Sequence, residues 1–321
     1  MPALESQARS CLSGDLVKML LCLGCRSRLT EREGGYLCPA CSRSFPNDRG
    51  VARFVEADNY ADSFGFQWQR YARTQLDNEI CKGSEIDFVR KTGLAAEQLK
   101  GKLVLDVGCG MGRFAEVATR WGAQVVGIDL SAAAEVAARN LRNREFVAFQ
   151  ADVFRLPFAP ATFDYIYSIG VLHHTPDCER AVKALPQYLK PGGQLAVWLY
   201  SGYNKWYRFS DIYRKFTTRL STRSLHGMLR VAVPVINTVD GAIRVVPLIG
   251  RSISGIIRYV LPVNRNPQRS WRVLDTFDWY SPKYQSKHTY EQVFRWFESC
   301  GLEDLHVGEI PVSVRGQMPL Q

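Results

Sequence analysis

Short apolar runs alternate with helical stretches along the middle of the chain. The runs Leu103–Val107, Gln124–Asp129 and Phe146–Gln150 are apolar and end at polar or glycine-containing turns, which is typical of buried strands. The segments Phe114–Trp121 and Ala132–Leu141 between them have helical character. Apolar strands that alternate with helices predict an α/β fold with a doubly wound parallel sheet.

The same alternation continues toward the C-terminus, with one long interruption after residue 201. The further elements that the pattern predicts are strands at Tyr165–Ser168 and Gln194–Tyr200, helices at Glu179–Leu189 and Thr289–Cys300, and last strands at Leu302–His306 and Pro311–Val314. Before the first strand, Glu85–Thr92 and Ala95–Leu99 are expected to be helices that lead into the sheet.

The first predicted strand leads into a glycine-rich turn. Asp106 is followed by Gly108, Gly110 and Gly112, and position 113 is Arg113, so the spacing differs from the dinucleotide fingerprint G-x-G-x-x-G. Glycines let a ligand approach the backbone closely, and the N–H groups of the following helix then point at that ligand. Asp129 ends the next strand, where a ribose-binding carboxylate is expected. The pattern predicts a nucleotide site.

This arrangement of Asp106, the three glycines and Asp129 resembles the class I S-adenosylmethionine-dependent methyltransferases of the methyltransferase type 11-like group. The resemblance implies a Rossmann-like, doubly wound seven-stranded methyltransferase sheet with a reversed edge strand, and S-adenosyl-L-methionine as cofactor. The cofactor-binding residues that it implies are Asp106, Gly108, Cys109, Gly110, Gly112, Asp129, Leu130, Asp152, Val153 and Ile169.

Asp152 follows the third strand. In the family, the carboxylate at this position accepts from the adenine amino group, and the next backbone N–H, here that of Val153, reaches a ring nitrogen. An aspartate at this place also suits an ordinary turn. The resemblance favours the adenine role.

Two adjacent histidines, His173 and His174, follow the fourth strand within Gly170–Asp177. Histidine titrates near neutral pH, so either ring could take a proton from the methyl acceptor as a general base. The alternative is that this stretch only begins a helix, as in many members of the family, with one histidine packed or capping. Transfer to a neutral amine would need no base.

Two CxxC pairs lie near the N-terminus and consist of Cys22, Cys25, Cys38 and Cys41. Their spacing suits a tetrahedral zinc ion held by four thiolates, whereas a redox CxxC would need only one pair and a thioredoxin-like context. The stretch resembles the zinc-ribbon modules found beside methyltransferases, including Phe45-Pro46 and Gly50-Val51 after the second pair. Four thiolates leave no open position, so a structural zinc is expected.

Positive charge is concentrated in one segment. The net charge is +10, and the thirteen Lys and Arg residues and two acidic residues from Lys205 to Arg272 give that segment +11. The arginines on one seven-residue register, and so on one helical face, are Arg223, Arg230, Arg244, Arg251, Arg258, Arg265 and Arg272. Aliphatic clusters lie between them, and Pro234, Pro247 and Pro262 are expected to break or kink the helices. The segment is therefore expected to form several short amphipathic helices.

Three interpretations of this segment remain. It is a solvated helical cap, a surface that docks on anionic lipid headgroups and admits a lipophilic substrate, or a phosphate-contacting surface for RNA. RNA is less favoured because the segment is rich in aliphatic residues and has no stacking signals.

Four segments are expected in the chain. Residues 1–58 form a zinc-ribbon-like module, 59–100 an N-terminal helical cap, 101–200 with 285–321 the methyltransferase core, and 201–284 a basic, apolar helical insertion after strand five. The aromatic residues of Tyr60–Tyr71 either belong to the core or cover the cofactor. The acceptor pocket is expected to include Tyr200, Tyr280, Tyr284 and His288.

These features together predict a methyltransferase that acts on a small acceptor, lipophilic or sugar-linked. The alternative is an rRNA or tRNA methyltransferase that docks RNA through the ribbon and the basic insertion, and a non-enzymatic cofactor-binding protein is a third possibility. An odd total of nine cysteines with CxxC pairs suits a reducing cytosol, so a cytoplasmic protein with peripheral membrane contact is expected.

Overall fold

The computed structural model describes residues 18–55, 59–77, 82–203 and 208–320. The chain divides into two compact units. The first consists of Met1–Ser201 and Tyr284–Gln321, and the second of Gly202–Lys283. Each unit is described by itself.

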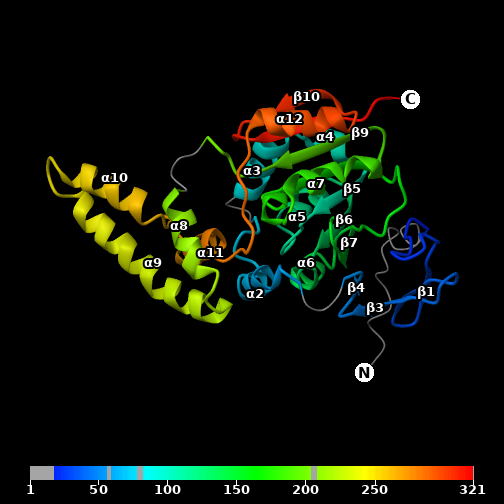
Figure 1. The fold of residues 1–321 in the computed structure, drawn as a ribbon, viewed down its shortest axis with the longest axis horizontal. Helices are drawn as coiled ribbons and strands as arrows, with labels where there is room; N and C mark the ends of the chain where they lie inside the picture. Colours follow the sequence, from blue (N-terminus) through cyan, green and yellow to red (C-terminus); the bar gives the residue numbers. More distant parts are fainter. Residues whose placement is uncertain (1–17, 56–58, 78–81, 204–207, 321) are drawn as a thin grey trace. The chain divides into compact units, whose positions relative to one another are not determined.

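A mixed sheet forms the centre of the first unit (Figure 1). Its strands, in spatial order, are β4 (Val51–Arg53), β7 (Phe146–Gln150), β6 (Gln124–Asp129), β5 (Leu103–Val107), β8 (Phe163–Ile169), β9 (Leu189–Trp198), β11 (Ser313–Gln317) and β10 (Glu303–Val307). The strands from β4 to β9 are parallel, and β11 runs antiparallel to both of its neighbours. The doubly wound Rossmann-like fold is confirmed, but the reversed strand β11 lies between β9 and β10, so it is not the edge strand that was expected.

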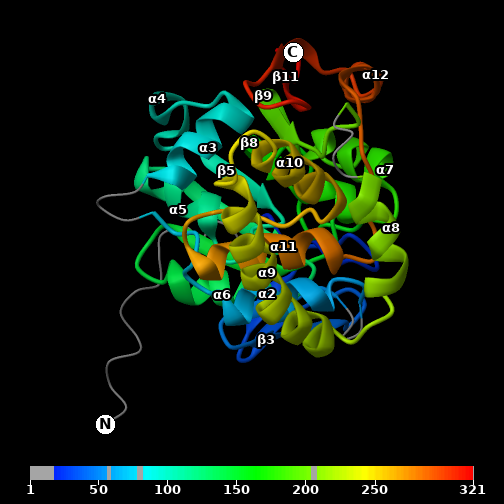
Figure 2. The same ribbon diagram turned by 90° about the vertical axis from the view of Figure 1, so that its left-hand side faces the viewer.

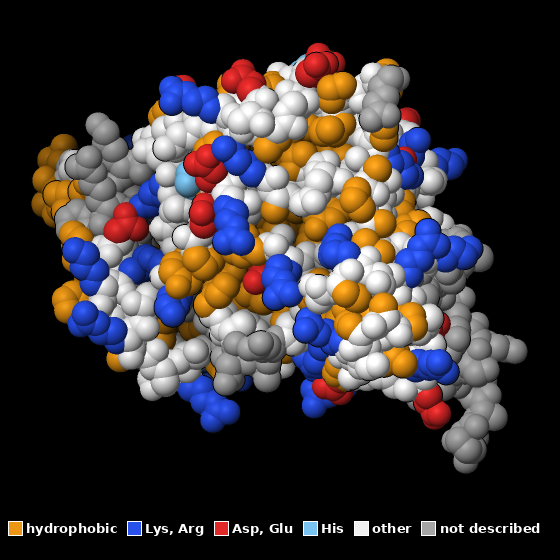
Figure 3. All heavy atoms as spheres, turned by 45° about the vertical axis from the view of Figure 1, so that its right-hand side comes forward, with side chains coloured by type: hydrophobic (Ala, Val, Ile, Leu, Met, Phe, Trp, Pro, Cys, Tyr) orange, Lys and Arg blue, Asp and Glu red, His pale blue; other side chains and the backbone are white. Residues whose placement is uncertain are grey.

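Helices cover both faces of the sheet. Along β5, Val104 packs with α3 and α5, whereas Leu105 packs with α7 and α12, because successive strand residues point to opposite faces. The helices are α2 (Asp62–Arg70), α3 (Gly83–Thr92), α4 (Ala96–Leu99), α5 (Arg113–Arg120), α6 (Ala133–Asn140), α7 (Cys178–Lys183) and α12 (Tyr290–Ser299). On the face drawn in Figure 3, Lys and Arg side chains are interspersed with acidic and apolar ones.

The region after the fourth parallel strand differs from the prediction. A helix was expected over Glu179–Leu189, but α7 is shorter and is followed by a 3₁₀ turn at Pro186–Tyr188. Proline has no N–H to donate and restricts the residue before it, so the helix does not continue to Leu189. Strand β9 then begins at Leu189, five residues earlier than expected.

The N-terminal ribbon is continuous with this sheet. Its strands are β1 (Thr30–Arg32), β2 (Gly35–Leu37), β3 (Ser44–Asp48) and β4, and β4 pairs in parallel with β7 through Ala52 and Phe149. Leu20 of the ribbon lies in the same apolar cluster as Phe149. The prediction of seven strands therefore missed one pairing, because a strand of three residues has no recognisable pattern.

The second unit is helical. It contains α8 (Arg208–Thr217), α9 (Thr222–Arg244), α10 (Gly250–Val260) and α11 (Arg269–Tyr280), and α9 and α10 lie side by side as a hairpin (Figures 1 and 2). The expectation of only short helices is wrong for α9, which has 23 residues and continues through Pro234. Pro247 and Pro262 lie outside the helices. No helix among the described residues has the length and apolar character needed to cross a bilayer.

Candidate functional site

The glycine turn after β5 is tied to the end of β6 by one carboxylate. Asp129 Oδ2 accepts from the Gly110 N–H at 3.0 Å, and Oδ1 accepts from the N–H and the hydroxyl of Ser131 at 2.8 and 2.7 Å. Gly108, Gly110 and Gly112 all have positive φ, and Gly112 precedes the first residue of α5. Parallel strands end at the same sheet edge, so one carboxylate can hold both turns.

Neighbouring side chains lie against all three glycines. A Cβ on Gly108 would lie 2.3 Å from Val171, one on Gly110 would lie 3.0 Å from the Trp68 indole, and one on Gly112 would lie 2.9 Å from Leu141. The expectation of bare backbone open to a ligand is therefore incomplete, because close packing also requires glycine at these positions. A ligand that approaches Gly110 meets the Trp68 indole.

Aromatic residues of α2 and the residues just before it border this edge of the sheet. Trp68 lies against Gly110, and Phe64 packs on His174 with ring centroids 5.3 Å apart. Tyr60 lies in edge contact with Tyr284 at 5.4 Å. Burial, together with the nearby carboxylates of Asp152 and Asp129, raises the pKa of Tyr60. Phe64 and Trp68 are four residues apart in α2, so their rings lie on the same face of this helix.

Asp106 is a buried carboxyl group directly before the glycine turn. Burial raises the pKa of Asp106 to about 8, with the Asp129 charge adding to the shift and Tyr167 opposing it. Its Oδ2 has no hydrogen-bond partner among the described residues. The adjacent Cys109 is also buried, and burial raises the pKa of its thiol. A buried carboxyl group with an unsatisfied oxygen is costly for stability and is typical of a functional site.

Further predicted cofactor residues lie at the ends of β6, β7 and β8. Asp152 Oδ1 accepts from the Phe154 N–H at 3.0 Å, so this side chain does form a turn, and Val153 is buried beside it. The Leu130 carbonyl accepts from Asn59 and Gln150. Ile169 ends β8 on the other side of β5. The cofactor roles of all these residues remain predictions.

A cavity of about 680 Å³ lies between this end of the sheet and the ribbon. Leu130 and Asp152 line it from the sheet, Phe45 and Phe54 from the ribbon, and Arg155 lies at its exposed edge. The ribbon thus forms one wall beside the predicted adenine residues. This wall was not predicted, because nothing in the sequence pattern relates the ribbon to β7.

Four of the predicted catalytic and acceptor residues form one cluster with a fifth nearby. His173 and His174 are buried in the turn after β8, and their rings lie 4.2 Å apart. Tyr200 stacks on His173 at 3.9 Å. The Tyr284 carbonyl lies 3.0 Å from His174 Nδ1. The His288 N–H donates to the Tyr200 carbonyl. The structure therefore brings these residues together, although no observation tests their roles.

The tautomer of His174 follows from its contact. A carbonyl oxygen can only accept, so Nδ1 carries the proton and the neutral ring has its lone pair on Nε2. Ser286, which the sequence analysis did not single out, donates its N–H to the His173 carbonyl at 2.8 Å, and its hydroxyl lies 2.7 Å from His288 Nε2. Burial lowers the pKa of His288. A lone serine in a loop carries no sequence signal.

Tyr280, the remaining predicted acceptor residue, lies in the second unit. It is buried, and its hydroxyl donates to the Pro262 carbonyl at 2.8 Å. This contact gives Tyr280 a packing role within the helical unit, and its acceptor role remains a prediction.

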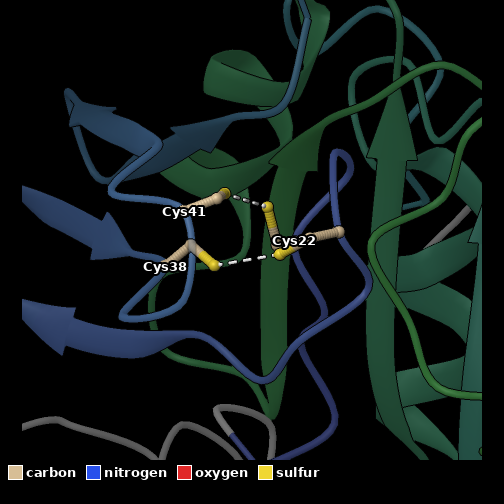
Figure 4. A group of neighbouring side chains, drawn as sticks. Cys22, Cys38 and Cys41 are labelled. Carbon is tan, nitrogen blue, oxygen red and sulfur yellow. Dashed lines mark hydrogen bonds between the residues drawn. The ribbon is translucent and has the colours of Figure 1, made fainter.

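The four ribbon cysteines converge on one point (Figure 4). Their sulfur atoms all lie within 4.8 Å of one another, with Cys22 to Cys41 at 3.6 Å and Cys25 to Cys38 at 3.4 Å. A tetrahedral zinc with Zn–S bonds of about 2.3 Å would require sulfur separations of about 3.8 Å. Ser27 lowers the pKa of Cys25 to about 6, which favours one thiolate. The donor set fits structural zinc.

The comparison with protein families identifies residues 105–197 as a match to the model described as "Methyltransferase domain". This stretch runs from β5 to β9 and contains the glycine turn, Asp129, Asp152 and both histidines. Together with the sheet order, the match shows that the chain contains a class I S-adenosylmethionine-dependent methyltransferase domain.

Individual relatives match part of the chain. "O-methyltransferase cnsE" of Penicillium expansum is 37% identical over 163 residues, which cover 49% of this chain and 59% of that protein. "Ubiquinone biosynthesis O-methyltransferase" of Nitrosococcus oceani is 37% identical over 140 residues, covering 42% and 59%. "Probable tRNA methyltransferase 9B" of Homo sapiens is 38% identical over 109 residues, covering 33% and 23%. The chain thus spans about three fifths of the first two relatives' length and less of the third.

The raised pKa of Asp106 predicts a pH-dependent stability. The folded-state pKa of about 8 lies above the unfolded value of about 3.9, so the contribution of Asp106 is fully present below the lower value and is lost as pH rises to the upper one. In urea unfolding without cofactor, the parent chain should therefore lose stability as the pH rises from 5 to 8, whereas Asp106→Asn should not. The free energy of unfolding of Asp106→Asn, measured relative to the parent chain, should rise over this range by at least about 1 kcal/mol. The exposed control Glu97→Gln should show no such trend, and a parallel pH profile for Asp106→Asn would contradict the assignment.

The cysteine cluster predicts about one zinc ion per chain by elemental analysis. Cys38→Ser should lose the zinc and lower the thermal midpoint, because Cys38 belongs to the same apolar cluster as the edge of the sheet. Cys300→Ser, which changes a cysteine outside the cluster, should retain both. The zinc site would be refuted if the parent chain is purified without zinc and the Cys38→Ser variant is as stable as the parent chain.

Proposed function

We propose that this chain, which carries a class I S-adenosylmethionine-dependent methyltransferase domain, transfers the cofactor's methyl group to a small acceptor, lipophilic or sugar-linked. The observation that carries the proposal is the junction at Asp129, where one carboxylate joins the glycine turn to the end of β6. Oδ1 already accepts two hydrogen bonds from Ser131, whereas Oδ2 accepts one from Gly110 and keeps a lone pair, so Asp129 can also accept from a ribose hydroxyl.

The proposed cofactor residues follow the sheet edge on both sides of β5. Asp106 lies near the end of β5, Gly108, Cys109, Gly110 and Gly112 belong to the turn that follows, and Ile169 ends the neighbouring strand β8. Leu130, Asp152 and Val153 would hold the adenine end. The buried carboxyl of Asp106 would meet the positively charged end of the cofactor, since a nearby cation favours the charged form of a buried carboxyl group and Oδ2 has no hydrogen-bond partner among the described residues.

S-adenosylmethionine supplies a methyl group already activated by the positive charge on sulfur, so the protein's task is mainly to position the acceptor and exclude water. Phe64, which packs on His174, and Trp68, which lies against Gly110, would exclude water at the strand ends. His174 holds its Nδ1 proton against the Tyr284 carbonyl, which leaves Nε2 able to take a proton from a hydroxyl acceptor. Tyr200, Tyr284 and His288 would border that acceptor.

A small acceptor is favoured over RNA by the burial of this cluster. His173 and His174 are 0% and 4% exposed and lie among aromatic rings, which favours a small acceptor over a bulky RNA. The names of two relatives specify O-methylation, and the name of the third specifies tRNA, so RNA methylation is the second candidate. Peripheral contact of a cytoplasmic protein with an anionic membrane is part of the proposal, because a lipophilic acceptor is presented there.

Zinc has a structural role in this proposal. With four thiolates it has no open coordination position, and it would hold the ribbon wall of the cavity beside Leu130 and Asp152.

Asp129→Ala tests the cofactor assignment. Loss of a charge-assisted hydrogen bond should weaken binding of S-adenosylhomocysteine about 10- to 100-fold in calorimetry, with the circular dichroism of the fold retained. Ser131→Ala, which removes one hydrogen bond to Asp129 and keeps the carboxylate, should weaken binding much less. Equal affinity of Asp129→Ala and the parent chain would rule out the ribose role.

The acceptor is tested by transfer of a radiolabelled methyl group from S-adenosylmethionine to fractionated cell extract. We expect label in the lipid or small-molecule fraction, at a rate that falls at least about tenfold in His174→Ala if a base is used. Label that nuclease releases from RNA would favour the second candidate. Binding of S-adenosylhomocysteine without any labelled product would favour a non-enzymatic role.

A further inference from the structure

The turn between α9 and α10 exposes a continuous apolar run. Val245–Ile249, which we call the hairpin tip, contains five apolar residues, and all of them are exposed. Leu248 is 100% exposed, Val245 81% and Ile249 57%. Single exposed apolar residues are normal, but an uninterrupted run at the end of a helical hairpin indicates an interaction surface.

The backbone of the hairpin tip holds Leu248 outward. Leu248 has φ +65°, in the left-handed region that is unfavourable for a residue with a Cβ. The turn is fixed by hydrogen bonds from the Ile249 N–H to the Pro247 carbonyl at 2.8 Å and from the Gly250 N–H to the Val246 carbonyl at 3.1 Å. A Cβ on Gly250 would lie 2.2 Å from the Ile243 carbonyl, so the tight turn requires glycine. Strain combined with full exposure is typical of a functional segment.

Two arginines flank the hairpin tip, and both are exposed. Arg244 ends α9 and Arg251 lies in the first turn of α10. Neither guanidinium lies within ion-pair distance of a carboxylate in the part of the chain that the structure describes. Their charges are therefore available to an external anion.

Two other arginines of the same register form ion pairs inside the helical unit. The buried carboxylate of Asp240 binds Arg258 at 3.2 Å and Arg265 at 3.1 Å, and it also accepts from the Ser254 hydroxyl at 2.7 Å. The arginines at seven-residue spacing therefore include two groups with different surroundings. Arg258 and Arg265 stabilise the hairpin, whereas Arg244 and Arg251 face outward beside the apolar run.

Further exposed apolar side chains follow each helix away from the hairpin tip. On α9 they recur at intervals of three or four residues, at Met228, Val231, Val235 and Val239, and on α10 at Ile253 and Ile256. This spacing places them on one face of each helix. An apolar partner therefore has a surface along the hairpin as well as at its end.

We infer that the hairpin tip inserts into the interfacial layer of an anionic lipid bilayer, with Arg244 and Arg251 against lipid phosphates. Apolar side chains enter the headgroup boundary, while long basic side chains extend to the phosphates around them. The inference rests on the membrane contact in the proposed function and identifies the residues that make it. It does not require methyl transfer.

Two other partners fit the hairpin tip less well. RNA would engage the arginines but offers nothing apolar for Leu248, and the tip has no aromatic side chain on which bases could stack. A symmetric contact between two tips would place Arg244 and Arg251 of one copy near those of the other, and like charges repel.

Vesicle flotation of the full chain tests the inference. We expect binding to phosphatidylcholine vesicles that contain phosphatidylglycerol, weaker binding at high salt, and little binding to phosphatidylcholine alone. The double variant Leu248→Gln/Ile249→Gln should bind anionic vesicles at least about tenfold less. Val307→Gln, which removes an apolar residue 58% exposed on β10, is the matched control and should bind like the parent chain.

The charge component is tested separately. Arg244→Gln/Arg251→Gln should weaken binding to anionic vesicles and reduce its salt dependence, whereas Arg32→Gln/Arg142→Gln, with the same loss of charge at other exposed positions, should not. All variants should retain the thermal midpoint and the S-adenosylhomocysteine affinity of the parent chain, which separates this test from the test of methyl transfer.

Three outcomes would overturn the inference. The first is absence of vesicle binding, or equal binding by Leu248→Gln/Ile249→Gln. The second is a dimer of the parent chain in sedimentation that this variant dissociates. The third is RNA binding, measured by gel shift, that depends on Arg244 and Arg251 and that vesicles inhibit by competition.

Discussion

The candidate site depends on the Asp129 carboxylate at the junction of two parallel strands. Val107 of β5 pairs with Ile128 of β6, and the next residues on each strand turn away toward different helices. Asp129 holds these turns together through Gly110 and Ser131, and the Ile128 carbonyl accepts from two further N–H groups of the glycine turn. The starts of α5 and α6 are thereby fixed relative to the sheet edge, which is where ligands of open α/β folds bind.

Polar groups that are costly to bury gather at this same edge. Asp106, His173 and His174 are all buried there, although an apolar core would be more stable without them. Charged or titratable groups are retained in such places when they have a task, and the departures from good packing indicate where that task is carried out. The packing of Val171 and Trp68 against the glycines shows how little space the site has.

The two additions to the methyltransferase domain differ in how they are built. The ribbon shares an apolar cluster and a strand pairing with the sheet, because a module of this size buries little core of its own. The helical unit buries its own residues, including Leu225, Leu274 and Phe277, around the α9–α10 hairpin. The ribbon is therefore placed to shape a cavity, and the hairpin to present a surface.

The sequence by itself determined the order of strands and helices, the bounds of β5, β6 and β7, the glycine turn, and the four-cysteine set, because each has a local periodicity or spacing. Tertiary structure alone decided that β4 pairs with β7, that Trp68 lies on Gly110, and that Tyr284 and His288 join the two histidines. It also decided which arginines Asp240 neutralises. These contacts join residues far apart in the chain. No local sequence pattern predicts which strand a three-residue strand such as β4 will pair with, or whether a turn will be exposed.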